Sequence, residues 1–208
     1  MRCPRVEGFR DVALFLFSLV LLLMLPGRPA QAQQWIASIP AASNPYAIAV
    51  NSTTNKIYVG NQTTNSVRVI DGITFAYNDI PVLEQPQFIA VNEVTNKIYF
   101  TSSAENSLYI IDGATNQVTQ LAVPLNGNPV IDTVRNKIYL AGTLGVAVVD
   151  GVTLSITNIS LPPPLSLLTM ALNVVTNKIY VTNSFDEAVY IVDGVTLSVT
   201  TIPLSRYS

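Results

Sequence analysis

Short apolar runs alternate with polar turns along the chain, and the same alternation returns at a fixed spacing. The string Thr-Asn-Lys-Ile-Tyr, once with Arg in place of Thr, recurs with its asparagines 41, 40 and 41 residues apart. These asparagines are Asn55, Asn96, Asn136 and Asn177. An apolar run ending in Asp-Gly follows each, and then a segment that closes on an apolar residue and proline. A period near 40 residues predicts a repeat protein built from four similar units.

Each unit predicts four short strands. In the first unit they are 46–50, 56–59, 67–70 and a segment ending at Pro81, because Val, Ile and Tyr are concentrated there between clusters of Asn, Thr, Asp and Gly. No window has a sustained helical period. The third strands are apolar almost throughout, which predicts sheets that are covered on both faces.

Radially packed sheets meet these requirements. Small residues in the first strands suit a crowded axis, and the closing prolines suit outer edge strands, which have no further ladder to donate to. We therefore predict an all-β fold: a β-propeller, or partial propeller, of four roughly 40-residue, four-stranded blades. One extra N-terminal outer strand is expected from Trp35 to Pro40.

The predicted repeat domain spans 33–208, with units at about 41–83, 84–124, 125–164 and 165–204. A terminal unit cannot cover its own apolar face. Three arrangements remain open: a piece of a longer ring, four blades that close with a spare strand, or two chains that share a ring. A homo-oligomer or missing further blades are therefore expected.

The first 32 residues predict a secretory signal peptide. Three arginines precede an apolar run of about 14 residues, and the small-x-small triplet at 30–32 follows it. The alternative is an uncleaved anchor, which the length of the run disfavours because roughly 20 residues are needed to span a bilayer. Cleavage after Ala32 would remove Cys3 and leave no membrane span. The expected location is secreted, periplasmic or cell surface.

The repeat strings carry a resemblance to a known family. Residues 180–183 read Tyr-Val-Thr-Asn, and 58–61 are a near copy. With the Asn-Lys-Ile-Tyr lead-in and the Asp-Gly turn that follows, the units resemble the YVTN-type β-propeller repeats of exported bacterial and archaeal proteins. The second and third units depart from the pattern at 99–102 and 139–142. The resemblance implies a β-propeller fold and an exported location, and it says little about what the protein binds or does.

Composition excludes several kinds of chemistry. Of 208 residues 49% are hydrophobic and 12% charged, with no histidine and one cysteine. Cys/His zinc sites, Ser-His-Asp triads and Cys-His pairs are therefore excluded, and so is a disordered chain. After signal removal seven basic and eleven acidic residues remain, so the sequence does not predict a basic surface that would bind nucleic acid.

The residues that recur in every unit favour structural roles. Asparagine tolerates left-handed backbone, and glycine is expected to supply positive φ in the Asp-Gly turns. The tyrosines of the repeat string favour packing between blades over base stacking. They are Tyr58, Tyr99, Tyr139 and Tyr180.

The loops that differ between units lie at the opposite end of each predicted blade, where binding residues concentrate on rigid scaffolds. The candidate ligand-binding residues are Asn61, Asn65, Ser102, Glu105, Asn106, Asn183, Asp186 and Glu187. The three carboxylates among them could hold a hard cation such as calcium or perform acid/base chemistry, and an ordinary solvated loop is the other reading.

We therefore predict an exported, non-catalytic binding or surface scaffold that has no catalytic residue, no bound metal and no cofactor. Its partner would be a protein or a small-molecule ligand. The alternative is a metal-dependent hydrolase resembling propeller lactonases, because propellers host both functions.

Overall fold

The computed structural model describes residues 38–40, 43–102, 104–125, 127–163, 169–183, 185 and 187–204. The predicted signal peptide lies outside these residues, as do positions 35–37 of the expected extra strand, whose positions 38–40 form no strand. Within the described ranges no helix is long and apolar enough to cross a membrane. The regular structure described consists of four four-stranded sheets, which we call blades 1 to 4 in chain order.

Each blade is an antiparallel meander whose strands pair in sequence order. Blade 1 contains β1 (Pro45–Asn51), β2 (Lys56–Asn61), β3 (Ser66–Asp71) and β4 (Tyr77–Pro81). Blade 2 contains β5 (Phe88–Asn92), β6 (Lys97–Thr101), β7 (Ser107–Asp112) and β8 (Val118–Ala122). Blade 3 contains β9 (Val130–Asp132), β10 (Lys137–Gly142), β11 (Gly145–Asp150) and β12 (Ile156–Ile159). Blade 4 contains β13 (Thr169–Asn173), β14 (Lys178–Asn183), β15 (Ala188–Asp193) and β16 (Val199–Pro203).

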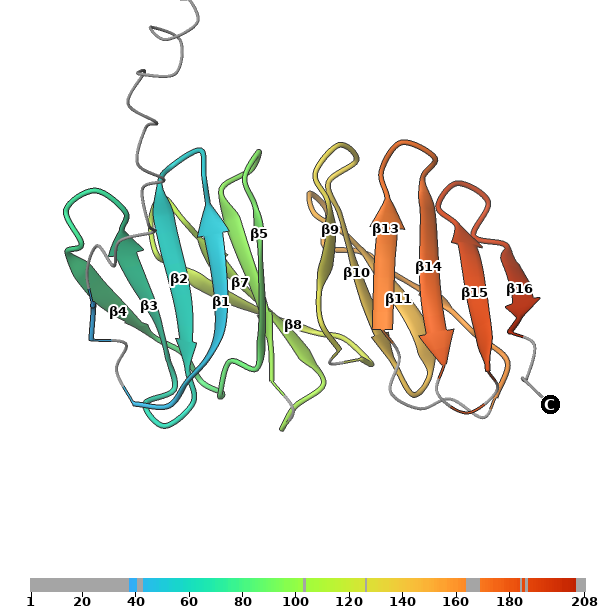
Figure 1. Cartoon of the computed structure of the whole chain (residues 1–208), viewed down its shortest axis with the longest axis horizontal. Coiled ribbons are helices and arrows are strands. Elements are labelled where there is room, and N and C mark those ends of the chain that lie inside the picture. Colours follow the sequence, from blue (N-terminus) through green and yellow to red (C-terminus); the bar gives the residue numbers. More distant parts are fainter. Residues whose placement is uncertain are drawn as a thin grey trace, which may run out of the picture. The chain divides into compact units, whose positions relative to one another are not determined.

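The blades follow one another around the first strands. β1 contacts β5, β5 contacts β9, and β9 contacts β13. Figure 1 shows these four strands next to one another in the middle of the view, with β4 and β16 at its two sides. The small first strands therefore lie innermost and the fourth strands form the outer edges, as the sequence predicts. Both four-blade division and all-β class are confirmed.

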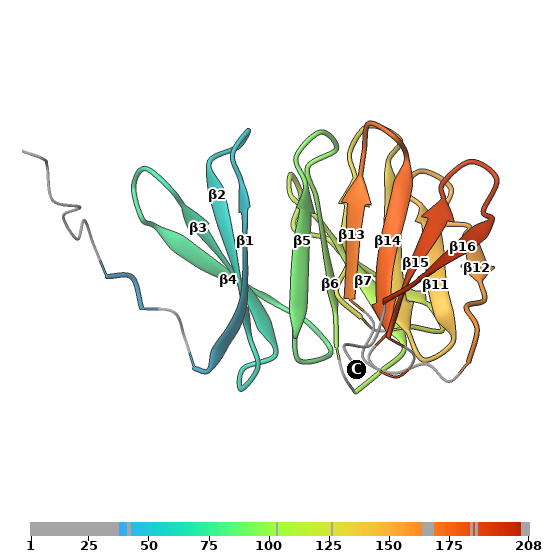
Figure 2. The same cartoon turned by 45° about the vertical axis from the view of Figure 1, so that its right-hand side comes forward.

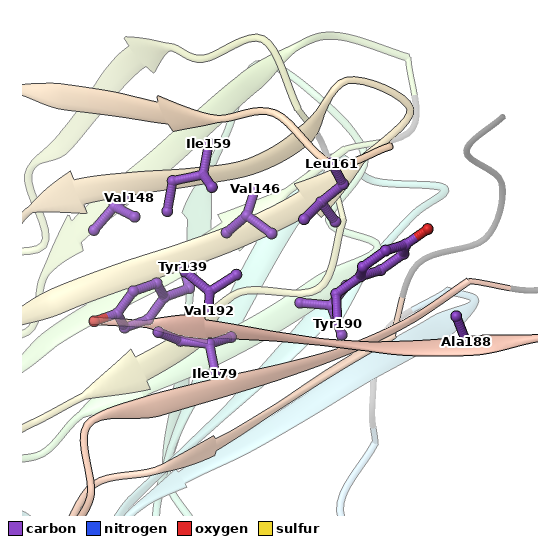
Figure 3. Close-up of a cluster of buried hydrophobic side chains, with 10 residues drawn as sticks. Tyr139, Val146, Val148, Ile159, Leu161, Ile179, Ala188, Tyr190 and Val192 are labelled. Atoms are coloured by element: carbon purple, nitrogen blue, oxygen red, sulfur yellow. The ribbon is translucent and has the colours of Figure 1, made fainter. Parts of the chain in front are cut away.

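Apolar cores fill the spaces between successive blades. One cluster joins blades 1 and 2, a second joins blades 2 and 3, and a third joins blades 3 and 4. In Figure 3, Val146 and Ile159 of blade 3 face Ile179 and Tyr190 of blade 4. The third strands of blades 2 and 3, β7 and β11, are buried on both faces because alternate residues enter different clusters. This arrangement explains why those strands are apolar without alternation.

Three of the repeated tyrosines are almost fully buried in these cores, which confirms their packing role. They are Tyr58, Tyr99 and Tyr139. Burial raises the pKa of each phenol. Tyr180 occupies the same position in blade 4 but is only half-buried, because no described blade follows it. Tyr180 is therefore more exposed than the other three because it belongs to the last described blade.

The turns of the repeat lie together at one end of each blade, at the top of Figure 2, and the variable loops lie at the other. The amide of Gly72 donates to the carbonyl of Asn55 at 2.8 Å, which links the two turns of blade 1. The asparagine has positive φ, as expected, but the glycine does not. A Cβ at Gly72 would lie 2.6 Å from the Asn55 side-chain oxygen. At Gly113, the equivalent glycine of blade 2, a Cβ would lie 2.8 Å from the backbone oxygen of Asn96, so glycine there permits the close approach of two turns. The positive φ of the blade 1 turn falls on Phe75.

Side-chain amides connect neighbouring blades at this turn end. Asn51 Nδ2 donates to Asn96 Oδ1 at 2.9 Å, and Asn92 Nδ2 donates to Asn136 Oδ1 at 2.9 Å. Both donors are fully buried. We call this pairing the interblade amide link. It ties the last residue of one first strand to the repeat asparagine of the next blade.

Candidate functional site

The loop end carries a cavity of about 610 Å³ lined by residues of blades 2, 3 and 4. The starts of β5 and β13 form part of its wall through Phe88, Thr169 and Met170. The connection between β8 and β9 contributes Leu125, and the β10–β11 hairpin contributes Leu144. The cavity therefore lies where the inner strands begin, at the end of the blades whose loops differ between units.

The polar groups of the cavity are neutral. They belong to Gln87, Asn106, Asn128, Thr143 and Thr169, and none of the described lining side chains is titratable. Amides and hydroxyls both donate and accept hydrogen bonds. Together with the apolar wall they suit an uncharged ligand that has hydrogen-bonding groups on an apolar body.

The wall of the cavity is closely packed at one point. Thr101 Oγ1 donates to the carbonyl of Gly127 at 3.1 Å, which anchors the β8–β9 connection to blade 2. A Cβ at Gly127 would collide with the carbonyl oxygen of Ala141. Glycine at this position therefore lets the connection press against β10 and define the rim of the cavity.

Of the candidate residues from the sequence, Asn106 lies in the cavity wall. Asn61 and Asn183 end β2 and β14, Ser102 directly follows β6, and all three are buried, so their side chains are not presented at the surface. Asn61 Nδ2 donates to the carbonyl of Val59 at 3.4 Å. These three positions therefore belong to the ends of the strands and not to the cavity.

Glu105 is exposed and binds within its own blade. Its Oε2 accepts a hydrogen bond from the Tyr109 hydroxyl at 3.0 Å and another from Gln120 Nε2 at 3.1 Å. Burial of the ring, followed by this contact with the carboxylate, raises the pKa of Tyr109 to about 12. Tyr109 and Gln120 also line a smaller cavity of about 370 Å³ between blades 1 and 2. Glu105 therefore orders the outer side of blade 2.

Asn65 and Glu187 occupy equivalent turn positions in blades 1 and 4. Both have positive φ, 43° and 48°. Their carbonyls accept hydrogen bonds from Val82 and Leu204, which close the fourth strands onto the loops. Asp186 lies outside the described residues. The structure thus gives Asn65 and Glu187 a backbone role at the loop end.

The Asp-Gly aspartates lie at the opposite end and have structural partners. Asp112 accepts from Lys97 Nζ at 2.6 Å and from two turn amides, and Asp150 is held in the same way by Lys137 at 2.7 Å. The lysine, then the turn amides, lower the pKa of Asp112 to about 2 and lower that of Asp150 further. Among the described residues no group of three Cys, His, Asp or Glu side chains could hold a metal ion.

Sequence reasoning missed most of the cavity. Phe88, Thr143 and Met170 look like ordinary strand or loop residues, and no local motif marks them. The one signal was the short loop at Thr143 in the third unit, which leaves room beside the inner strands. The other lining residues come together only because blades 2, 3 and 4 meet at this end of the fold.

Solved structures with the same arrangement of strands are β-propellers. Apo AztD from Citrobacter koseri superposes with a TM-score of 0.62 at 15% identity, over 77% of this chain and 47% of its own. The Cps50 (Swd1) β-propeller domain of Myceliophteria thermophila matches with a TM-score of 0.66 at 8% identity, over 84% and 58%. Hydrazine synthase from Kuenenia stuttgartiensis matches with 0.56 at 16% identity, over 83% and 52%.

These similarities establish the β-propeller fold and nothing finer. The chain spans about half the length of AztD and of hydrazine synthase. No family model and no curated protein matches the chain. The resemblance to the YVTN-type repeats is therefore carried by the repeat strings alone.

Proposed function

We propose that this chain is an exported β-propeller of the YVTN-repeat type that acts as a non-catalytic binding scaffold. Its ligand is an uncharged molecule, or an uncharged segment of a partner, held in the cavity at the loop end. The observation that carries the proposal is the neutral lining of that cavity, where amides and hydroxyls surround an apolar floor.

The distribution of carboxylates supports a binding role over hydrolysis. The aspartates of the Asp-Gly turns stand at the far end of the blades and are held by lysines and turn amides. Glu105 is held by Tyr109 and Gln120. A lactonase-like hydrolase would need an activated water or a cation near its substrate, and the described residues of the cavity lining include neither a base nor an anionic ligand.

Ligand binding is tested with Met170→Trp, which fills the cavity, and with Val152→Trp at an exposed turn of the opposite end as the matched control. The probes are neutral oligosaccharides and peptides blocked at both termini, followed by calorimetry and thermal shift. We expect at least one probe to raise the melting temperature of the wild type and of Val152→Trp, but not of Met170→Trp. If only charged probes bind, or if Met170→Trp binds equally well, the assignment is wrong.

The hydrolase alternative is tested with calcium, a chelator and simple lactones. We expect the melting temperature to stay constant with calcium or chelator, and lactone hydrolysis to stay at the buffer rate. Calcium-dependent turnover would overturn the non-catalytic proposal. Export is tested by N-terminal sequencing of protein recovered outside the cytoplasm, which we expect to begin at Gln33.

A further inference from the structure

Successive blades meet through one repeated interface. The face of a blade that carries the repeat tyrosine, which we call its front face, packs on the opposite face of the next blade, its back face. In the interface of blades 1 and 2, Ala49 of the front face packs in the cluster that contains Ile89 of the back face. The amide link from Asn51 to Asn96 crosses the same interface.

The back face of blade 1 has no described blade against it. Ile48 of β1 matches Ile89 of β5 in the repeat, yet Ile48 is 67% exposed where Ile89 is 9% exposed. Val50 and Tyr46 on the same face are also exposed. Asn55, which matches the acceptor Asn96, is exposed as well. The inner strand of blade 1 thus presents the apolar residues and the amide acceptor of a repeat interface.

The outer part of that back face is engaged within the chain. Arg68 donates to Asp79 at 2.7 Å and to the carbonyl of Pro40, and its guanidinium lies 4.0 Å from the ring centroid of Tyr77. The surface left open on blade 1 is therefore its inner strand.

The front face of blade 4 is open in the complementary way. Ile202 is 46% exposed, whereas Ile159 at the same position of blade 3 is 6% exposed. Ala171, which matches Ala49, is exposed, and Tyr180 is only half-buried. Asn173 matches the buried donor Asn51 but is exposed, and within the described chain only its side-chain oxygen makes hydrogen bonds, to two turn amides.

We propose that the front face of blade 4 binds the back face of blade 1 of a second copy of this chain, head to tail. The two faces are the front and back halves of an apolar interface that the described chain forms three times, twice with the amide link. In the complex, Ala171 of one copy covers Ile48 of the other, and the Asn173 amide donates to the Asn55 side-chain oxygen as Asn51 does to Asn96. A second copy fits because its front face carries the same alanine and the same amide donor that a back face meets within the chain.

Two substitutions at exposed positions test the docking without disturbing any core between blades. Ile48→Asp places a carboxylate on the back face and Ala171→Asp places one on the front face, while Val152→Asp at an exposed turn is the control. The full chain and each variant are measured by multi-angle light scattering and sedimentation velocity. We expect two chains per particle for the wild type and for the control, and one chain for each face variant, because each substitution removes both contacts of a closed pair.

Mixing the two face variants gives the decisive measurement. Ile48→Asp retains a sound front face and Ala171→Asp a sound back face, so an equimolar mixture regains one contact and forms a two-chain particle. A mixture that stays single-chain overturns the proposal, as does a wild-type pair that survives either substitution. A single-chain wild type also overturns it, and the open faces would then belong to further blades or another partner. Ligand binding in the cavity is measured separately, so either proposal can fail alone.

Discussion

Blade 3 lacks the interblade amide link that blades 1 and 2 form. Asp132 stands where those blades have Asn51 and Asn92, and a carboxylate has no proton to donate. The acceptor in blade 4, Asn177 Oδ1, is buried and has no hydrogen-bond partner. Arg135 replaces the threonine of the repeat string and donates to Asp132 Oδ2 at 3.0 Å. Asp132 and Arg135 of the third unit are therefore one coupled change.

The expected energies follow from burial. Asp132→Asn supplies an amide N–H that can donate to the buried side-chain oxygen of Asn177. Satisfying that oxygen should stabilise the fold by about 1–3 kcal/mol. The substitution loses the ion pair to Arg135, whose side chain is 36% exposed, worth about 0–1 kcal/mol, while Arg135 keeps its hydrogen bond to the Val174 carbonyl of blade 4 at 2.9 Å. We expect Asp132→Asn alone to raise the free energy of unfolding by about 1–2 kcal/mol. Adding Arg135→Thr should remove about 0.5–1.5 kcal/mol of that gain, because the hydrogen bond to Val174 is lost. Arg135→Thr alone leaves the buried carboxylate with two backbone donors and should cost about 1–3 kcal/mol.

Urea unfolding followed by far-UV circular dichroism measures all four proteins, at one protein concentration so that any association is constant. The double-mutant cycle should show coupling: Arg135→Thr costs more beside Asp132, where it also removes the partner of a buried carboxylate, than beside asparagine, where it loses only the hydrogen bond to Val174. If Asp132→Asn is no more stable than the wild type, the missing amide link does not limit the interface of blades 3 and 4, and the reasoning fails.

Three further outcomes are expected. Phe75 has a φ of 59°, so Phe75→Asn should raise the free energy of unfolding by about 0.5–1 kcal/mol in urea titrations, since asparagine accepts left-handed backbone. The pKa of Asp112 is lowered to about 2 by Lys97 and turn amides, so its stabilisation is present above the ordinary pKa of 3.8 and lost as the pH falls toward 2. Melting temperature should therefore decline over that range less steeply in Asp112→Asn than in the wild type. Gly127→Ala should lower the melting temperature and weaken probe binding, because the new Cβ meets the Ala141 carbonyl.

The repeat period and the apolar third strands determined the fold class and the division into four blades. These features are local: strands of Val, Ile and Tyr bounded by Asn and Asp-Gly turns leave few alternatives to an antiparallel meander. Covered faces on both sides then require blades stacked around an axis. The structural roles of Asn55 and Tyr58 also followed from recurrence, since a residue fixed in every unit serves what every unit shares.

Tertiary structure decided what differs between units. Of the candidate residues, Asn106 lies in the wall of the cavity, which forms where three blades converge. Asn61 and Ser102, at the ends of the second strands, are buried inside their blades instead. Glycine in the Asp-Gly turn is needed for an approach between two turns that no local rule contains. The exposure of Ile48 and the burial of Ile89 arise from one sequence pattern, and only the presence or absence of a neighbouring blade separates them. The sequence of a strand therefore determines which of its faces are apolar, and the packing of neighbouring blades determines which of those faces are buried.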